Sequence, residues 1–377
     1  MEEVSGPKAK LVSLRKTING WPTDSISIDF YKEETNDAAT SSSSSSSSHK
    51  YKPNIILLFI PGNPGLIEWY SDTLIKIVEQ LGVGYAVRGI SYAGHGAGTD
   101  VIGSTDDHKQ NFVNTSGGHQ NAGAAKMSVS WTIEGQIRHK LSWVDGVIDE
   151  WKAEFKSSSQ SSELPRFIFI SHSFGAYIVQ HLLLRRPNIL QQTQHIIHLM
   201  PFIRFDPPPL QKMVLSTLAR SYEYTIPLLC NFVRALTSTL SPKLIDTYLN
   251  KVVGLDCDKG RKIAVDVCTH PHMVKNHLVL GFEEIRELPE LPNDVAFRII
   301  GRTCPTSILF CGDPDQWAPL SHMEKLKELQ SKSLINNIHC TYMEELTHDF
   351  IVHPKMIEPV VNFCLDRIKH PKFSSKL

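Results

Sequence analysis

Short apolar segments alternate with amphipathic ones along most of this chain, and this alternation limits its possible folds more than any other feature. The apolar segments are mostly continuous runs, such as NIILLFI (54–60), rather than strict every-second-residue patterns. Continuous runs are typical of parallel strands covered on both faces, and intervening helices are typical of the connections between such strands. The sequence therefore predicts an α/β fold with a doubly wound, mostly parallel sheet.

The expected elements follow one another in a regular order. Strands are predicted at 54–60, 85–91, 166–171, 195–200, 306–311 and 338–343, and helices at 68–81, 131–155, 174–186, 320–332 and 355–369. Three stretches are expected to be loops: the serine run at 41–48, the serine-rich residues 157–162 and the irregular residues 99–128.

The alternation breaks between residues 201 and 302, where the chain is helix-prone and interrupted by prolines. Sheets of this kind bind ligands at the carboxyl ends of their strands, so this insertion is expected to form a helical cap over that edge. A separate helical bundle domain is the alternative that the length allows. The predicted division is an N-terminal segment at 1–50, a core at 51–200 and 303–377, and a cap at 201–302.

The segment FISHSFGAY (169–177) carries the sharpest chemical signal. Ser173 stands between an apolar strand and a helix pattern, where hydrolases with the G-x-S-x-G signature hold a nucleophilic serine on a tight turn. Gly175 supplies one of the two small neighbours, whereas Ser171 replaces the usual first glycine. The Ser171 hydroxyl either crowds the turn or bonds locally. Ser173 is the predicted nucleophile, and an ordinary strand-to-helix connection is the alternative.

A serine nucleophile needs a base and a carboxylate that orients it, and in this class the acid precedes the histidine along the chain. The segment FCGDPDQWAP offers Asp313 and Asp315, and Asp315 is preferred because its spacing from Gly312 carries it toward the last loop. His348 follows the last strand and is the predicted base. It is preferred to His353, which stands where the final helix begins.

The oxyanion of such a reaction needs backbone N–H donors, one from the residue after the nucleophile and one from an early loop. The first is Phe174, and the second is sought in IPGNPGLIEWY. The prolines of this loop have no N–H, which leaves Gly62, Asn63 and Gly65. Asn63 is the preferred donor because it follows the usual glycine position.

Two other patterns do not support a cofactor. GHGAG (94–98) lacks the glycine spacing and the following helix of a dinucleotide loop. His270, His272 and His277 are not completed by a carboxylate or cysteine at metal-site spacing, so a solvated cluster is the preferred interpretation. No cofactor and no metal are expected. His172, beside the nucleophile, is expected to point into the fold.

Charge and composition restrict the partners. The 377 residues include 39 Lys and Arg and 39 Asp and Glu, so no net field favours nucleic acid or an anionic membrane. Seven scattered cysteines and an acidic start without an apolar leader indicate a reducing compartment. With no apolar run long enough to span a bilayer, a soluble or peripheral protein is expected.

The chain closes on Ser375-Lys376-Leu377, the tripeptide that the peroxisomal import receptor reads at a free C-terminus. A polar tail without a targeting role is the alternative. The tripeptide indicates an address, and it carries no information about chemistry.

The blocks FIPGNPGLIEWY, SYAGHG, IEGQIRHKLSWV, SHSFGAY, CGDPDQWAP and THDFIVH together resemble the lipid droplet-associated hydrolase family of α/β-hydrolases. The resemblance runs from about residue 54 to 369 and is weak in the cap. PGNPG together with GQIxHKL is distinctive of the family, whereas a triad alone fits many families. Ser171 and the serine-rich insert depart from the family pattern.

The resemblance implies an α/β-hydrolase fold with Ser173, Asp315 and His348 as nucleophile, acid and base. It also implies neutral lipid substrates such as sterol esters or acylglycerols, and a peripheral position on lipid droplets or the endoplasmic reticulum. Two rivals are an acyl-CoA thioesterase of the same fold and a non-catalytic droplet protein with a vestigial triad. The basic cap residues Arg204, Lys212 and Arg220 do not decide for the thioesterase.

Overall fold

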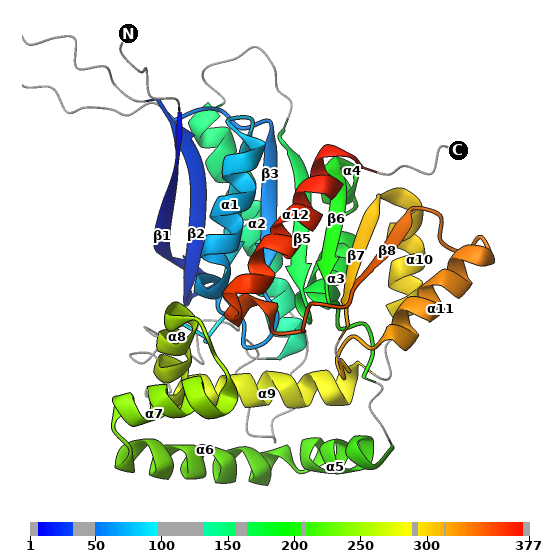
Figure 1. Ribbon diagram of the computed structural model, residues 1–377. Helices are drawn as coiled ribbons and strands as arrows, with labels where there is room; N and C mark the ends of the chain where they lie inside the picture. Colours follow the sequence, from blue (N-terminus) through cyan, green and yellow to red (C-terminus); the bar gives the residue numbers. More distant parts are fainter. Residues whose placement is uncertain are drawn as a thin grey trace, which may run out of the picture.

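The computed structural model describes residues 7–32, 50–96, 132–155, 164–205, 209–288, 293–312 and 314–371. These residues form one twisted sheet with helices on both faces and a further group of helices across one end (Figure 1). The serine run at 41–48 and the tripeptide at 375–377 lie outside the described residues.

All six predicted strands are found, and two more precede them. The strands are β1 (Lys8–Ile18), β2 (Trp21–Tyr31), β3 (Ile55–Ile60), β4 (Tyr85–Ile90), β5 (Arg166–His172), β6 (Thr193–Leu199), β7 (Thr306–Cys311) and β8 (Ile338–Met343). Their order in the sheet is β1-β2-β4-β3-β5-β6-β7-β8. Among the described strands, neighbours are parallel from β4 to β8 along this order, and the pairs β1–β2 and β2–β4 are antiparallel, which confirms the predicted fold class.

The five predicted helices that flank the sheet are found, with boundaries that differ by at most a few residues, and the short helices at 187–192 and 350–352 are additional. Together they are η1 (Ile67–Tyr70), α1 (Ser71–Leu81), α2 (Ile133–Phe155), α3 (Gly175–Arg185), α4 (Pro187–Gln192), α11 (Leu320–Ser331), η6 (Phe350–Val352) and α12 (Pro354–Lys369).

Alternate residues of β3 point to opposite faces of the sheet, and both faces are buried. Leu58 belongs to a core cluster with Trp143 of α2, on the side that α3 also covers. Leu57 belongs to a second cluster with Leu74 of α1, on the side that α12 covers. Two apolar faces explain why the strand sequences are continuous apolar runs.

The hairpin of β1 and β2 is absent from the sequence prediction. Ile18 pairs with Trp21 across Asn19 and Gly20, whose φ angles are 52° and 80°. Asn-Gly with two positive φ angles is a strong hairpin signal, so these two neighbouring residues are enough to indicate the turn. Because β2 pairs with β4, residues 8–31 belong to the sheet, and the predicted core boundary at residue 51 is wrong.

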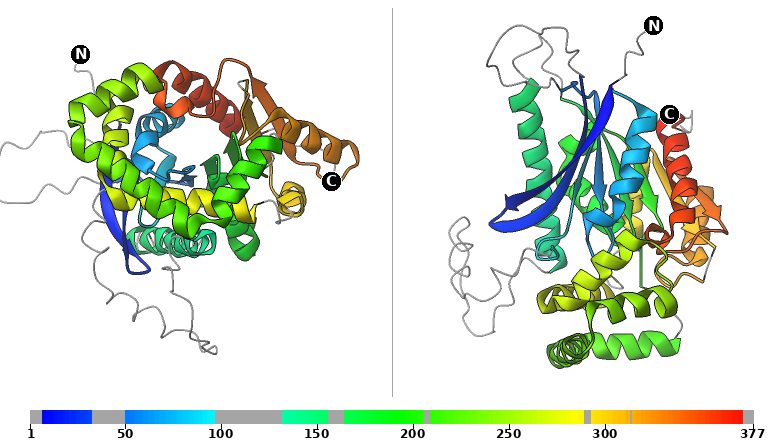
Figure 2. Two further views of the ribbon diagram at one scale, coloured as in Figure 1. Left: turned by 90° about the horizontal axis from the view of Figure 1, so that it is seen from below. Right: turned by 60° about the vertical axis from the view of Figure 1, so that its left-hand side comes forward.

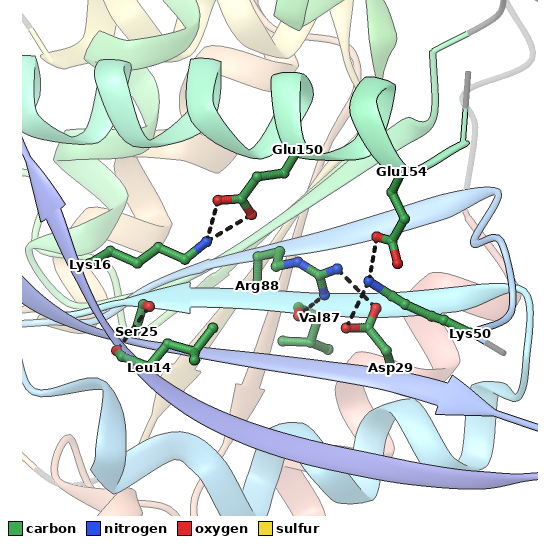
Figure 3. A network of polar contacts seen from close by, with 9 residues as sticks. All are labelled: Leu14, Lys16, Ser25, Asp29, Lys50, Val87, Arg88, Glu150 and Glu154. Carbon is green, nitrogen blue, oxygen red and sulfur yellow. Dashed lines mark hydrogen bonds and ion pairs between the residues drawn. The ribbon is translucent and has the colours of Figure 1, made fainter. Parts of the chain in front are cut away.

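Ion pairs fasten this hairpin to its neighbours (Figure 3). Lys16 of β1 pairs with Glu150 of α2 at 2.5 Å. Asp29 of β2 accepts from Arg88 of β4 at 2.9 Å and also pairs with Lys50. The Asp29–Arg88 pair is buried, so loss of Asp29 would remove this carboxylate from beside a buried guanidinium, whereas loss of Arg88 would leave Asp29 paired with Lys50.

The described chain between β6 and β7 is almost entirely helical, as the cap prediction requires. It comprises α5 (Pro209–Arg220), α6 (Tyr222–Thr239), α7 (Pro242–Tyr248), η5 (Leu249–Val253), α8 (Asp258–Thr269), α9 (Pro271–Glu287) and α10 (Asn293–Thr303).

Helix α9 connects these helices to the sheet. Its Asn276 donates to the carbonyl oxygen of Gly94, beyond the end of β4, and its His277 carbonyl accepts from Asn63, beyond the end of β3. Helices α5 and α6 lie outside α9 (Figure 1), and the view from below shows them crossing it (Figure 2, left). Helix α10 instead packs on α3. The insertion therefore covers the carboxyl ends of the strands.

Candidate active site

Ser173 occupies a strained turn between β5 and α3. Its φ is +49°, a left-handed conformation that is uncommon for a residue with a side chain. The chain passes so close to its neighbours here that a Cβ added at Gly175 would lie 2.4 Å from the Ile60 carbonyl oxygen. One added at Gly62 would lie 2.7 Å from the Ser173 Cβ. Both glycines are therefore required by space, as expected for a nucleophile elbow.

The structure brings Ser173, His348 and Asp315 together in one hydrogen-bonded chain. His348 Nε2 lies 2.9 Å from Ser173 Oγ, and His348 Nδ1 lies 2.6 Å from Asp315 Oδ2. An ionised carboxylate can only accept, so Nδ1 carries the proton and the bare Nε2 of a neutral ring can accept from the serine. This is the arrangement in which a histidine acts as a base toward a serine.

Asp315 is held ionised although it is buried. Burial raises its pKa, but the hydrogen bond and charge of His348, with the Ala318 and Trp317 amides, outweigh burial and lower the pKa to about 2. Those amides donate to Asp315 Oδ1 at 3.0 and 2.8 Å. Its rival Asp313 lies outside the described residues.

His353, the alternative base, contacts other groups. Its Nε2 lies 3.3 Å from an oxygen of Asp349, and its Nδ1 lies 3.7 Å from an oxygen of Asp256. It immediately precedes α12, where the sequence also places it. The choice of His348 over His353 agrees with this geometry.

The early loop at 61–65 narrows the choice of oxyanion donor. Gly62 lies against Ser173, and the N–H of Gly65 donates to the Gly62 carbonyl at 2.6 Å. The Gly65 N–H is thus engaged elsewhere. Gly62 and Asn63, which the sequence favours, stay candidates on this loop, and Phe174, at the start of α3, is the candidate for the other donor.

Ser171 does not crowd the turn. Its Oγ lies 2.7 Å from Nδ1 of His198 on the neighbouring strand β6, and both residues are buried. The hydroxyl is therefore accommodated by a side chain rather than by the local backbone.

The sequence predicts no role for Tyr70, and for His172 it predicts only that the side chain points into the fold. His172 does point into the fold, where its Nδ1 lies 2.8 Å from the Tyr70 hydroxyl. Its Nε2 lies 2.9 Å from the main-chain oxygen of His348. No sequence motif signals these contacts, because they join three distant segments: the end of η1, the end of β5 and the loop that carries His348.

An apolar wall stands beside the triad. The ring of Phe202 lies 5.2 Å from that of Trp317, and Phe205 lies 6.2 Å from the same ring. The Phe202 amide donates to the Ser173 carbonyl at 3.1 Å, so the wall is built directly on the segments that hold the nucleophile and the acid.

The cap histidines have partners of their own. His270 Nδ1 lies 2.6 Å from the carbonyl oxygen of Asp266, and its ring is 5.9 Å from that of His272. His277 instead packs on His95 with ring centroids 4.6 Å apart. In the part of the chain that the structure describes, no three His, Cys, Asp or Glu residues converge as metal ligands. Each helix in the same part is too short or too polar to cross a membrane.

Comparison with known proteins agrees with this fold. A family model described as lipid-droplet associated hydrolase matches residues 53–351. The lipid droplet-associated hydrolase of Rattus norvegicus is 22% identical over 282 residues, covering 73% of this chain and 74% of that protein. The protein of the same name from Homo sapiens is 23% identical over 287 residues, covering 74% and 75%.

Solved structures share the architecture. A haloalkane dehalogenase from Agrobacterium tumefaciens superposes with a TM-score of 0.55 at 14% identity, covering 96% of this chain and 97% of its own. An epoxide hydrolase from Vigna radiata gives 0.51 at 14% identity, covering 95% and 98%. At such low identity these structures show the α/β-hydrolase fold and not the reaction.

Proposed function

Because this chain belongs to the lipid droplet-associated hydrolase family, a family of α/β-hydrolases, we propose that it is a serine hydrolase that cleaves carboxylic esters of lipids. The hydrogen-bonded chain from Ser173 through His348 to Asp315 carries this proposal. It is supported by the positive φ of Ser173, which presents the hydroxyl at the apex of a tight turn under the cap.

In the proposed reaction His348 Nε2 removes the hydroxyl proton of Ser173 while Oγ attacks the ester carbonyl carbon. The N–H groups of Phe174 and Asn63 donate to the resulting oxyanion. When the tetrahedral intermediate collapses, the bond to the alcohol oxygen breaks and His348 returns the proton to that oxygen. Water then attacks the acyl-serine in the same way, which releases the carboxylic acid and restores Ser173.

Apolar substrates are favoured by the surroundings of the triad. Phe202, Phe205 and Trp317 pack together beside the segments that hold Ser173 and Asp315, and such apolar surroundings suit an acyl chain or a sterol better than a polar substrate. The substrates proposed are therefore sterol esters and acylglycerols. Cleavage of acyl-CoA is the nearest alternative.

The outer surface of the cap supports a position on a lipid droplet. Tyr224, Leu228, Phe232 and Leu236 recur at every fourth residue of α6 and are 81, 70, 64 and 47% exposed. This spacing aligns them along one side of the helix. We call these four residues the α6 stripe. Leu210, Met213 and Val214 of α5 are also exposed.

Charge near the α6 stripe also suits a lipid surface. Residues 209–253 contain five basic side chains and two acidic ones. Exposed apolar area of this kind with basic neighbours is typical of helices that lie in a phospholipid interface. We therefore propose that the cap rests on the droplet or on the endoplasmic reticulum membrane, with the active site above it.

Reaction with a fluorophosphonate tests the catalytic proposal. The wild-type protein is expected to be labelled at Ser173 and to hydrolyse a lipid ester, and Ser173→Ala is expected to lose both. His348→Gln is expected to lose labelling, while its matched control His353→Gln keeps it, because His353 does not contact Ser173. Absence of labelling in folded wild-type protein would favour the non-catalytic alternative. A substrate panel of cholesteryl esters, acylglycerols and acyl-CoA then assigns the class.

Partition onto triolein droplets coated with phosphatidylcholine tests the surface. Replacing Leu228 and Phe232 together with serine is expected to lower the bound fraction at least about tenfold, because two apolar side chains no longer enter the interface. The control Leu14→Ser changes an exposed leucine of β1, 42% exposed, and should bind like wild type. Equal binding by all three proteins would contradict the proposed surface.

Peroxisomal import through Ser375-Lys376-Leu377 stays a prediction of the sequence. A fluorescent fusion at the N-terminus is expected to reach peroxisomes, whereas one that masks Leu377 is not. Identical distributions would contradict the address.

A further inference from the structure

His172 is the last residue of β5, immediately before the proposed nucleophile, and is buried. Its Nε2 is 2.9 Å from the main-chain oxygen of His348, and its Nδ1 is 2.8 Å from the Tyr70 hydroxyl. The rings of His172 and His348 are 5.0 Å apart, and the ring of Phe350 lies edge-on to His172 at 5.3 Å. The side chain therefore lies against the loop that carries the proposed base.

The direction of each hydrogen bond can be assigned. The carbonyl oxygen of His348 can only accept, so Nε2 of His172 carries a proton. Burial, reinforced by the charge of His348, lowers the pKa of His172 to about 3, so the ring is neutral and its Nδ1 is bare. The Tyr70 hydroxyl must then donate to Nδ1. The backbone of Gly62 lies against the same imidazole, since a Cβ added at Gly62 would be 3.1 Å from His172 Nδ1.

The resulting series runs from the Tyr70 hydroxyl through His172 to the His348 carbonyl. Tyr70 ends the η1 helix that follows the 61–65 loop, His172 immediately precedes Ser173, and His348 is the proposed base. The three segments that the proposed reaction needs are thus joined by one set of buried hydrogen bonds that is separate from the Ser173–His348–Asp315 chain.

We propose that Tyr70 and His172 are positioning residues. Their hydrogen bonds hold the His348 loop and the 61–65 loop at the distances from Ser173 that the proposed reaction needs. This inference rests on the proposed function. The argument is geometric, since a base must stay within hydrogen-bonding distance of the hydroxyl whose proton it takes, and small displacements lower the rate. Loss of the series should therefore lower kcat and leave KM nearly unchanged, because no member binds the substrate.

Two substitutions of His172 separate its two nitrogen atoms. The side-chain nitrogen of glutamine can occupy the position of Nε2, so His172→Gln keeps a donor for the His348 carbonyl. The shorter asparagine can accept from Tyr70 at the position of Nδ1 but does not reach His348. We expect His172→Asn to lower kcat about tenfold, the scale of one lost hydrogen bond, and His172→Gln to restore kcat to within about threefold of wild type.

Tyr70→Phe tests the other end of the series. Phenylalanine keeps the contact with Phe59, whose ring lies 4.6 Å from that of Tyr70, and removes only the hydroxyl. We expect kcat to fall several-fold. The double variant with His172→Asn should be little worse than His172→Asn alone, because both changes interrupt the same series.

His195→Asn is the matched control for a buried histidine. His195 is equally buried in β6, with its Nε2 3.0 Å from Ser307 Oγ, and it contacts neither Ser173 nor the His348 loop through that bond. The His195→Asn variant should lower thermal stability as His172→Asn does, but it should leave kcat unchanged. A purely structural role for His172 would instead make both variants lose activity only in proportion to lost folded protein.

The outcomes distinguish this inference from the proposed function. If Ser173→Ala is inactive while His172→Asn and Tyr70→Phe retain wild-type kcat, the positioning role is wrong and the hydrolase proposal stands. If wild-type protein shows no Ser173-dependent hydrolysis, the proposed function is wrong, and the positioning role, which rests on it, is wrong as well. If His172→Asn does not fold, Tyr70→Phe with wild-type kcat still overturns the inference.

Discussion

The hydroxyl of Ser171 lies 2.7 Å from Nδ1 of His198, across the pair of strands β5 and β6 that ends at the nucleophile. A glycine at this position is therefore not needed for space, because the added hydroxymethyl has a partner on the next strand. The departure from G-x-S-x-G is compensated by a histidine 27 positions further along the chain.

Ser171→Gly is expected to keep activity and to lose stability. Activity should persist because Ser171 does not bond to Ser173, Asp315 or His348. The lost hydrogen bond costs about 1 kcal/mol, and glycine in a strand adds roughly 0.5 to 1 kcal/mol. Urea unfolding measures the sum, and Ser171→Ala isolates the hydrogen bond. A large loss of kcat in Ser171→Gly, with the protein folded, would contradict this interpretation of the turn.

Gly175→Ala is expected to abolish activity or folding. The added methyl group would lie 2.4 Å from the carbonyl oxygen of Ile60 and 2.6 Å from that of Pro61, and neither backbone atom can move freely. Gly146 is the control, since a methyl group there meets nothing within 4 Å and lies on α2. Gly146→Ala should stabilise the protein by roughly 0.5 to 1 kcal/mol and leave kcat unchanged.

Asp315→Asn is expected to lower kcat by about 10³-fold or more, because an amide can present a donor to His348 and disfavour the required tautomer. The exposed Asp256→Asn should leave kcat unchanged.

The pKa of Asp315, lowered to about 2, also predicts an effect on the stability of the fold. A carboxyl whose pKa is lowered on folding stabilises the protein above its unfolded pKa, here near 4, and that contribution is lost as pH falls toward 2. Asp315→Asn should flatten the pH dependence of the melting temperature only in this range.

Buried histidines predict a loss of stability at mildly acidic pH. Burial lowers the pKa from 6.5 to about 3 for His95, His172 and His198, and to about 4 for His195. Between those values and 6.5 the unfolded chain binds protons that the folded chain does not, so unfolding is favoured as pH falls. Each such histidine contributes up to about 1.4 kcal/mol per pH unit.

The melting temperature should therefore be nearly constant above pH 7 and should fall steeply from pH 6 to pH 4. His198→Asn keeps a side chain that can bond to Ser171 and removes one titrating ring. Its free energy of unfolding should vary less steeply with pH, by about 1.4 kcal/mol per unit. A melting temperature that does not change between pH 7 and pH 4.5 would contradict the assigned burial.

The sequence determined the features that depend on neighbouring residues. Apolar runs and helix periodicity located the strands from β3 to β8, the flanking helices and the cap insertion, because these patterns reflect burial of one or two faces. The order of Ser173, Asp315 and His348 along these elements was enough to nominate all three. The Asn19-Gly20 dipeptide also indicates its hairpin through neighbouring residues alone, although the sequence prediction does not include it.

Only the tertiary structure decided which groups meet. The partners of His172 lie 102 and 176 positions away, at Tyr70 and His348, and the partner of Ser171 lies on another strand. Such contacts are set by how distant segments pack, and a hydrogen bond between them depends on distances of a few tenths of an ångström that residue type and spacing do not contain.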